Sequence, residues 1–202
     1  MKDIFVLGLT GPTGAGKSTV AAFFEKKGFA VINADETAKY VRENSPSVKR
    51  ALADTFGGDL ITDGSVDRKK LAERAFSSKE ATEKLNAILL PPIADEIRRR
   101  ALFLKKNGAR AVILDAPLLF EAGLEGLCDL TVAVLADPQV RLERIIKRDG
   151  LSKDSAESRM AAQHDDAFYS SRADRVIRNG GNEQELLSSL ESIEKELGKA
   201  VL

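Results

Sequence analysis

Residues 11–18 read Gly-Pro-Thr-Gly-Ala-Gly-Lys-Ser and match the pattern G-x-x-x-x-G-K-[ST] over its full length. The apolar run 4–9 precedes them and the helix-like run 19–24 follows, which is the strand-then-helix setting that the pattern requires. Glycines allow successive backbone N–H groups to point inward, and the helix N-terminus adds partial positive charge. The stretch predicts a loop that holds a triphosphate, with Lys17 on the β- and γ-phosphates and Ser18 on a magnesium ion.

The composition is that of an ordinary globular protein. The chain has 202 residues, of which 43% are hydrophobic, so one main domain with a buried core is expected. Lysine and arginine number 31, as do aspartate and glutamate, and this balance argues against nucleic acid or an anionic membrane as a partner. Cys128 is the single cysteine, which excludes an internal disulfide and suggests a small buried residue.

The first apolar run breaks at Thr10-Gly11-Pro12. It is too short for the core of a signal peptide and far too short for a membrane span. We therefore expect a cytoplasmic protein that does not enter a membrane. The sequence does not specify an oligomeric state.

Apolar runs and helical patterns alternate along most of the chain. Strands are expected at 4–9, 30–32, 111–114, 130–135 and 176–177, and helices at 17–27, 91–106, 138–148 and 183–197. Several runs are continuously apolar, as in parallel strands that helices cover on both faces. The alternation predicts a doubly wound α/β domain with a five-stranded parallel sheet and ligands at the carboxyl ends of the strands.

Two segments depart from this alternation. The stretch from about Glu36 to Leu90 reads as several short helices without a convincing strand, and so predicts an all-helical insertion. Its position after the second strand is where a P-loop kinase can place a subdomain for the phosphate acceptor. The stretch from Leu151 to Asp166 reads as a polar helix that Ser152 can cap.

Two aspartates stand at the predicted carboxyl ends of strands. Asp115 ends the run 111–114 and suits a magnesium ion, held directly or through water, although a helix cap or a turn before Pro117 is the alternative. Asp35 follows the second strand, where it could accept the proton of an acceptor hydroxyl as a general base. An N-cap of the next helix is an equal alternative for Asp35.

Arg141, Arg144 and Arg148 are three and four residues apart, so they share one face of a helix. Together with the polar segment 151–166 they suggest a lid that closes over ATP and brings positive charge to the transition state. A solvated face with salt bridges to Glu143 or Asp149 is the alternative. The turn that begins at Asn179 could contact the nucleotide base, or could only join a strand to a helix.

Separated motifs give these residues a family resemblance between about Ile4 and Asn179. The motifs are Gly8-Leu9-Thr10-Gly11 before the loop, Asn33-Ala34-Asp35, Asp115-Ala116-Pro117-Leu118-Leu119-Phe120-Glu121, Arg144 with Arg148-Asp149, Arg159 with Gln163, and Ala173-Asp174-Arg175-Val176-Ile177-Arg178-Asn179. In these motifs the chain resembles the dephospho-coenzyme A kinase family. The resemblance implies a three-layer P-loop NTPase fold with a helical substrate-binding insertion and a short helical lid.

The resemblance further implies ATP-dependent phosphorylation of the ribose 3′-hydroxyl of dephospho-coenzyme A, with Mg2+. The nucleotide-binding core would comprise residues 1–35 and 91–202, the coenzyme A subdomain 36–90 and the lid 141–166. Asp35, Lys17 and Arg148 would be catalytic, and Ser18 and Asp115 would hold the metal. ATP would be bound by Gly11, Pro12, Thr13, Gly14, Ala15, Gly16, Lys17, Ser18, Thr19, Arg144 and Asn179. The acceptor would be bound by Asp35, Leu118, Phe120 and Glu121.

Two positions depart from the family pattern. Leu90 stands where the family usually carries a histidine before proline, and Arg141 stands where glutamine is common. Leu90 is the reason to keep a second hypothesis, a P-loop kinase for another nucleoside-like or small hydroxyl metabolite. A GTPase switch is disfavoured because the chain lacks Asn-Lys-x-Asp for guanine recognition.

Overall fold

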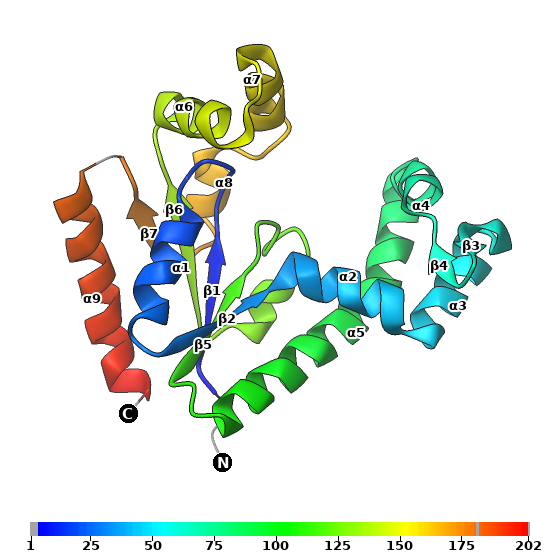
Figure 1. The fold of residues 1–202 in the computed structure, drawn as a ribbon, viewed down its shortest axis with the longest axis horizontal. Coiled ribbons are helices and arrows are strands. Elements are labelled where there is room, and N and C mark those ends of the chain that lie inside the picture. Colours follow the sequence, from blue (N-terminus) through cyan, green and yellow to red (C-terminus); the bar gives the residue numbers. More distant parts are fainter. Residues whose placement is uncertain (1–3, 181, 202) are drawn as a thin grey trace. The chain divides into compact units, whose positions relative to one another are not determined.

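The structure is a computed structural model that describes residues 4–180 and 182–201. The chain forms two compact units, the first of Met1–Ile32 and Ala101–Leu202 and the second of Asn33–Arg100 (Figure 1). Within the residues that the structure describes, no helix is both long and apolar enough to cross a bilayer.

The first unit is built on a five-stranded sheet with the strand order β2-β5-β1-β6-β7. The strands are β1 (Val6–Thr10), β2 (Phe29–Asn33), β5 (Ala111–Asp115), β6 (Leu130–Leu135) and β7 (Arg175–Arg178). β1 pairs in parallel with β5 and β6, and β6 pairs in parallel with β7. All five residues of β1 are buried, as expected for a central parallel strand covered on both faces. The doubly wound parallel fold predicted from the sequence is confirmed.

Helices α1 (Lys17–Glu25) and α9 (Glu183–Val201) lie side by side on one face of this sheet (Figure 1). Their contact residues follow helical spacing, because α9 buries Leu186, Leu190, Ile193 and Leu197 at intervals of three and four. These side chains join Phe24 and the inward residues of the strands in one continuous core. Packing against α9 and the sheet therefore holds α1 in place. The loop that precedes α1 is anchored through it.

The opposite face carries α8 (Asp166–Ser170), whose Tyr169 is fully buried against Ala133 and Leu135 of β6. Phe120 and Phe168 pack around the same cluster. The short 3-10 helix η2 (Leu124–Leu127) contacts β1. Helices thus cover both faces of the sheet, which gives the three layers that the sequence predicts.

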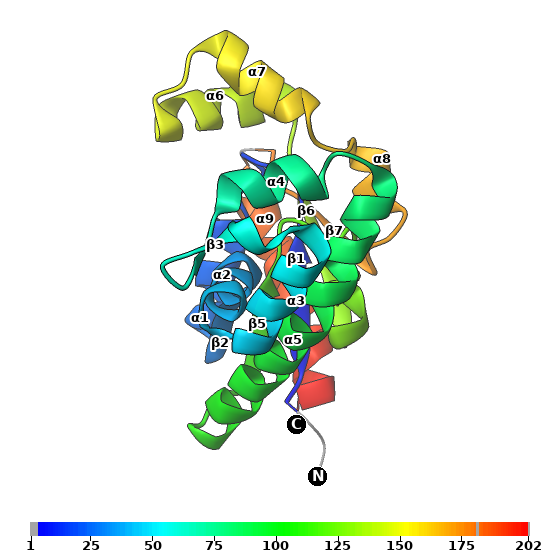
Figure 2. The ribbon, with the colours of Figure 1, turned by 90° about the vertical axis from the view of Figure 1, so that its right-hand side faces the viewer.

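Helices α6 (Pro138–Asp149) and α7 (Lys153–Ala161) lie side by side (Figure 2). They share a small core of Leu142, Ile145 and Ala156. Ser152 caps α7 by accepting a hydrogen bond from the Ser155 N–H, which confirms the predicted cap. Gly150 ends α6 in the left-handed conformation, at φ 65°.

The second unit contains α2 (Ala34–Asn44), α3 (Pro46–Phe56), η1 (Gly58–Leu60), β3 (Ile61–Thr62), β4 (Ser65–Val66), α4 (Arg68–Ala75) and the larger part of α5 (Lys79–Lys106). Helix α3 packs against α2, η1 and α4. Arg74 of α4 donates two hydrogen bonds to Asp59, at 2.7 and 2.8 Å, and holds the pKa of that carboxyl well below its ordinary value. This pair ties α4 to the turn that follows α3.

Two features of the second unit differ from the sequence expectation. The segment predicted to lack strands contains the antiparallel pair β3 and β4, joined by Asp63 and Gly64, which both have positive φ. Positive φ at both turn residues is the geometry that a two-residue hairpin requires. The hairpin was missed because strands of two residues are too short to show alternation.

Helix α5 begins at Lys79, and the start predicted at Pro91 is wrong. Pro91 and Pro92 lie inside the helix, where each lacks the N–H that would bond to the preceding turn. Proline is favoured at a helix start for the same reason, so the sequence signal pointed to the wrong role. Buried Leu85 before the prolines and Ile93 and Ile97 after them anchor both halves of the helix.

Cys128 lies beneath β1, and a Cβ added at Gly8 would come within 2.6 Å of its Sγ. Burial, with a smaller contribution from Asp129, raises the pKa of this thiol from 9.0 to about 12. We expect its alkylation by iodoacetamide to keep rising about tenfold per pH unit above pH 9, where an ordinary thiol levels off. The rate measured in urea should level off near pH 9, and the same plateau in the native protein would contradict the shift.

Candidate active site

The first unit contains a cavity of about 1070 Å³ beside the loop between β1 and α1. The residues predicted for the site that line it are Thr13, Gly14, Gly16, Lys17, Ser18, Thr19, Asp115, Arg144, Arg148 and Asn179. They come from the loop, the end of β5, helix α6 and the end of β7. The sheet topology brings these segments together because the carboxyl ends of parallel strands share one edge.

The loop depends on glycine at two positions of close approach. Gly11 has φ +133°, and a Cβ there would lie 2.1 Å from the Val134 carbonyl oxygen of β6. Gly16 has φ +96°, and its Cβ would lie 2.1 Å from Nδ2 of Asn179. A side chain at Gly11 would force the backbone to move, and one at Gly16 would displace the Asn179 side chain and strain the backbone at its positive φ. The loop is therefore wedged between β6 and the residue that follows β7.

Lys17, the first residue of α1, folds back over this loop. Its Nζ donates to the Gly11 carbonyl oxygen at 2.7 Å and, more weakly, to that of Pro12 at 3.4 Å. The ammonium group is therefore held beside the loop where the predicted triphosphate would bind.

Asn179 and Arg144 hold the loop by donating hydrogen bonds to its carbonyl oxygens. Asn179 is only 6% exposed, and its Nδ2 donates to the Ala15 carbonyl oxygen at 2.9 Å. Arg144 donates to the side chain of Asn179 at 3.3 Å and to the carbonyl oxygens of Gly14 and Ala15 at 3.3 and 3.4 Å. These contacts satisfy loop carbonyls that would otherwise be buried without donors.

Replacing Asn179 by Ala should lower the free energy of unfolding by about 1–3 kcal/mol, because the Ala15 carbonyl then loses the shorter of its two hydrogen bonds, at 2.9 Å, and keeps only the one from Arg144 at 3.4 Å. ATP affinity should fall as well, since the loop loses its support. Urea denaturation and ATP titration measure the two effects. Asn107→Ala removes an exposed amide at the end of α5 and is the matched control. Equal losses in the two variants would show that Asn179 does not support the loop.

The three arginines of α6 all reach the loop, as their shared helix face predicts. Arg141 is 5% exposed and donates from Nε to the Thr13 carbonyl oxygen at 2.9 Å, and its burial lowers the pKa of the guanidinium. Nη2 of Arg148 lies 3.4 Å from the hydroxyl oxygen of Thr13. The alternative of surface salt bridges holds in part, because Arg148 also pairs with Asp149.

The Asp149 carboxylate accepts hydrogen bonds from two arginines. Arg148 donates to both of its oxygens, at 2.7 and 2.9 Å, and Arg159 of α7 donates to Oδ2 at 2.6 Å. Hydrogen bonding from Arg148 lowers the pKa of the Asp149 carboxyl, and the same bond raises the pKa of Arg148. Both groups are therefore charged at neutral pH.

Both backbone polar groups of Thr13 have side-chain partners. Its N–H donates to Oε1 of Gln163 at 2.9 Å, while its carbonyl accepts from Arg141. Gln163 follows α7 and Arg141 lies in the first turn of α6. Both ends of the α6–α7 pair are thereby fastened to one residue of the loop.

The residues present fit a magnesium ion. The Ser18 hydroxyl and the Asp115 carboxylate line the same cavity and supply the hard oxygen ligands that Mg2+ prefers. Across residues 4–180 and 182–201, no three His, Cys, Asp or Glu side chains gather as a metal cage. A site with few protein ligands suits Mg2+, which usually keeps waters and binds substrate phosphates.

Other residues predicted for the site do not line the cavity. Gly11, Pro12 and Ala15 are buried in the loop itself. Leu118 is 56% exposed, Phe120 packs near Tyr169, and Glu121 has one buried carboxylate oxygen without a hydrogen-bond partner among the described residues. Asp35 is an exposed residue in the first turn of α2, in the second unit. Asn33 caps that helix through the Glu36 N–H, so the capping alternative for Asp35 is wrong.

The lining also contains residues that the site prediction left out. They are Pro117, Lys147, Arg159, Gln163, Glu183 and Leu186. Arg159 and Gln163 are four residues apart, and Lys147 is three after Arg144. The helical spacing that selected the arginines of α6 would also have selected these three side chains.

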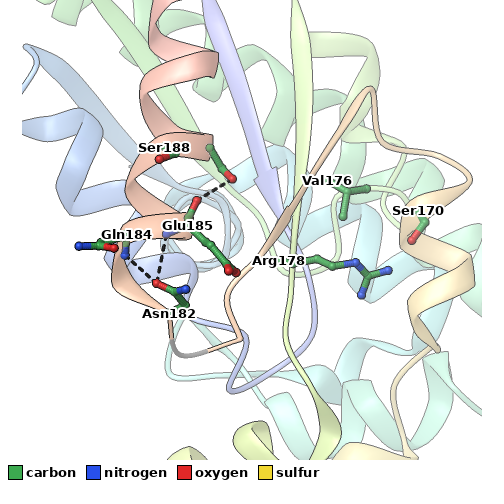
Figure 3. Close-up of a pocket in the computed structure, with 8 residues that line it drawn as sticks. Ser170, Val176, Arg178, Asn182, Gln184, Glu185 and Ser188 are labelled. Atoms are coloured by element: carbon green, nitrogen blue, oxygen red, sulfur yellow. Dashed lines mark hydrogen bonds between the residues drawn. The ribbon is translucent and has the colours of Figure 1, made fainter.

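A second, open hollow of about 820 Å³ lies between β7, α8 and the first turns of α9 (Figure 3). Its lining consists of Val176 and Arg178 of β7 with Ser170, Asn182, Gln184, Glu185, Ser188 and Ser189. Asn182 accepts hydrogen bonds from the N–H groups of Gln184 and Glu185 and so caps α9. Of the polar side chains drawn there, Asn182 serves the start of α9, while Ser170 donates to the Asp166 carbonyl and Arg178 pairs with the Asp166 carboxylate.

A loop of this kind serves many nucleotide-binding proteins, and its surroundings narrow the class. Here it follows the central strand of a doubly wound sheet, and guanidinium groups from a separate helical pair lie beside it. These are the fold and the nucleotide site of a P-loop kinase, an enzyme that transfers phosphate from ATP. The family model for dephospho-CoA kinase matches residues 5–185, and the chain belongs to that family.

Individual relatives agree with the family match. The chain is 38% identical to the dephospho-CoA kinase of Fusobacterium nucleatum, with 94% of this chain and 96% of that protein aligned. It is also 38% identical to the dephospho-CoA kinase of Geobacillus kaustophilus, over 94% of this chain and 95% of the relative.

Two solved structures have the same fold. A Thermus thermophilus protein is 33% identical and superposes with a TM-score of 0.77, over 97% of this chain and 99% of the other. The dephospho-CoA kinase of Campylobacter jejuni is 28% identical, with a TM-score of 0.64 and 98% of each chain covered.

Proposed function

We propose that this protein transfers the γ-phosphoryl group of ATP to the ribose 3′-hydroxyl of dephospho-coenzyme A, giving coenzyme A and ADP. The observation that carries the proposal is the match to the dephospho-CoA kinase family over residues 5–185. The cavity beside the loop, with Lys17, Asp115 and Arg148 in its lining, supports phosphoryl transfer from a nucleoside triphosphate.

In the proposed complex, ATP lies with its phosphates on the loop 11–19. Backbone N–H groups and the N-terminus of α1 bind the phosphates, while Lys17 exchanges the Gly11 carbonyl for phosphate oxygens. Arg144 and Asn179 keep the loop in shape. Arg148, which also lines the cavity, stabilises the charge that develops on the transferring group.

Ser18 and Asp115 would hold Mg2+, which supplies charge neutralisation on the phosphates when bound. Ser18 lies in the first turn of α1 and Asp115 is the last residue of β5, so regular secondary structure positions both side chains.

We assign acceptor binding to the predicted insertion, residues 36–90, which belongs to the second unit. Leu118, Phe120 and Glu121 are assigned to the same role. Asp35 acts as the general base: its carboxylate takes the proton of the 3′-hydroxyl as that oxygen bonds to the γ-phosphorus. The bond between the γ-phosphorus and the β–γ bridging oxygen breaks, and ADP leaves. Residues 141–166 form a lid that excludes water during transfer.

We also propose that the enzyme acts in the cytoplasm on a small-molecule substrate. Equal numbers of acidic and basic residues give no general attraction to nucleic acid. A kinase for another nucleoside-like or small hydroxyl acceptor is the second candidate, and Leu90, in the position where the family usually has histidine, is the observation that favours it.

The first test is an assay with the purified full chain, Mg2+ and ATP. Dephospho-coenzyme A is the acceptor, adenosine and pantetheine 4′-phosphate are controls, and ADP release and product mass are followed. A phosphate-sized gain in mass on dephospho-coenzyme A alone supports the proposal. ADP release with only another acceptor supports the second candidate and overturns the first.

A further inference from the structure

The carboxylate of Asp149 lies between the guanidinium groups of Arg148 and Arg159, which both line the loop cavity. We propose that Asp149 is a positioning residue that fixes the directions of Arg148 and Arg159 and thereby places Arg148 for phosphoryl transfer. The inference deepens the proposed function and rests on it for its catalytic consequence.

The geometry around Asp149 leaves Arg148 little freedom. Nε and Nη2 of Arg148 donate to separate oxygens of Asp149 at 2.7 and 2.9 Å, which is the paired arrangement that fits a planar guanidinium to a carboxylate. Because the two residues are adjacent in sequence, the pair forms within one turn of chain. Nη2 also lies 3.4 Å from the Thr13 hydroxyl, so the fixed group is turned toward the loop.

Arg159 completes the arrangement from the other helix. It donates to Oδ2 of Asp149 at 2.6 Å and, like Arg148, lines the cavity. Two guanidinium groups this close repel each other, and one shared carboxylate offsets that repulsion. The net charge of the three groups is +1, compared with +2 for the two arginines alone.

The position of Asp149 argues against a role in helix stability. It is the last residue of α6, where a carboxylate faces the negative end of the helix dipole. Lys147 and Arg148 in the same turn have the favourable sign, and Gly150 ends the helix through its own N–H to the Ile146 carbonyl. A carboxylate at this position therefore does not stabilise the helix. It does offset the repulsion between the two arginines.

A purely structural role, a link between α6 and α7, makes a different prediction, and Asp149→Asn separates the two. The amide keeps the size of the side chain but has one acceptor oxygen and no charge. If Asp149 positions Arg148, kcat should fall by about 10²-fold, the cost of misplacing a catalytic group by about 1 Å. The affinity for MgATP should be unchanged or higher, because the cavity gains positive charge.

A merely structural link would weaken MgATP binding in parallel with kcat and lower the melting temperature. Asp95→Asn is the matched control, since it removes the same charge by the same substitution from an exposed aspartate whose partner is Arg98, outside the lid. That variant should keep the kcat of the wild type. Parallel losses of kcat and MgATP affinity in Asp149→Asn, or equal kcat in the two variants, would overturn the inference.

A second measurement needs no acceptor. In the wild-type protein without nucleotide, the Nε–H signal of Arg148 in an ¹⁵N correlation spectrum should be protected from exchange with water, and Arg148→Lys assigns it. Asp149→Asn should abolish the protection, and its persistence would contradict positioning. If the wild type does not phosphorylate dephospho-coenzyme A, the proposed function fails, while this signal and the MgATP affinity still decide the role of Asp149.

Discussion

Replacing Asp35 by Asn should lower kcat by about 10²- to 10⁴-fold, the range for loss of a general base. Asparagine keeps the shape of the side chain but cannot accept the proton of the acceptor hydroxyl. MgATP binding should change little, because the residues that line the nucleotide cavity all belong to the other unit of the chain. Steady-state kinetics with dephospho-coenzyme A and a separate ATP titration measure the two effects.

Glu36→Gln is the control for Asp35. Both carboxylates are exposed in the first turn of α2, so both substitutions remove the same charge from the same helix start. Any loss due to the helix dipole should therefore appear equally in both variants. If Asp35→Asn is no slower than Glu36→Gln, Asp35 is not the base.

Replacing Arg148 by Ala should lower kcat by about 10³-fold, the lower end of the range for an arginine that stabilises a transferring phosphoryl group. ATP affinity should fall much less, because the side chain is 60% exposed and its hydrogen bond to the loop, within the described part of the chain, is a long one to the Thr13 hydroxyl. An interaction that strengthens in the transition state appears in kcat rather than in ground-state binding. The loss should exceed that of Asp149→Asn, which displaces the group without removing it.

Arg172→Ala is the control for the removal of a positive charge from the first unit. Arg172 is exposed and stacks on Phe168 outside the cavity lining, so its loss should leave kcat unchanged. Equal losses of ATP affinity and kcat in Arg148→Ala would make Arg148 a ground-state ligand of ATP.

The sheet and the loop could be predicted from the sequence because their signals are local. The five apolar runs became five strands, and the glycine pattern from Gly11 to Gly16 requires the backbone that the structure shows. Positive φ and close approach to Val134 and Asn179 leave no alternative to glycine. A continuous apolar run of strand length likewise has few other uses in a chain of this composition.

The errors arose where one residue type serves two purposes. Proline is favoured at helix starts and is also found inside some helices. Pro91 was therefore interpreted as a start, and the first half of α5 was not predicted as part of the same helix. Asn33 and Asp35 are both good caps, and only the structure shows that Asn33 takes the Glu36 N–H. The Asp63-Gly64 turn was a readable hairpin signal, but the flanking strands are only two residues long.

The contacts that hold the site could not be predicted, because they join residues far apart in sequence. Thr13 and Gln163 are 150 positions apart, and Asn179 reaches Ala15 across 164. Helical spacing grouped the arginines on one face but could not say that Arg141 would be buried against the loop while Arg148 stayed exposed. That difference depends on where α6 lies beside the loop.

The hydrogen bond from Lys17 to the Gly11 carbonyl bears on the thermodynamics of nucleotide capture. Ordering a long side chain at a binding site costs about 0.5–1.5 kcal/mol, and here that ordering takes place during folding. An arriving triphosphate then replaces one acceptor of an already stationary ammonium group. Preorganisation of this kind raises the affinity for nucleotide without adding a contact, because the loss of side-chain entropy precedes binding.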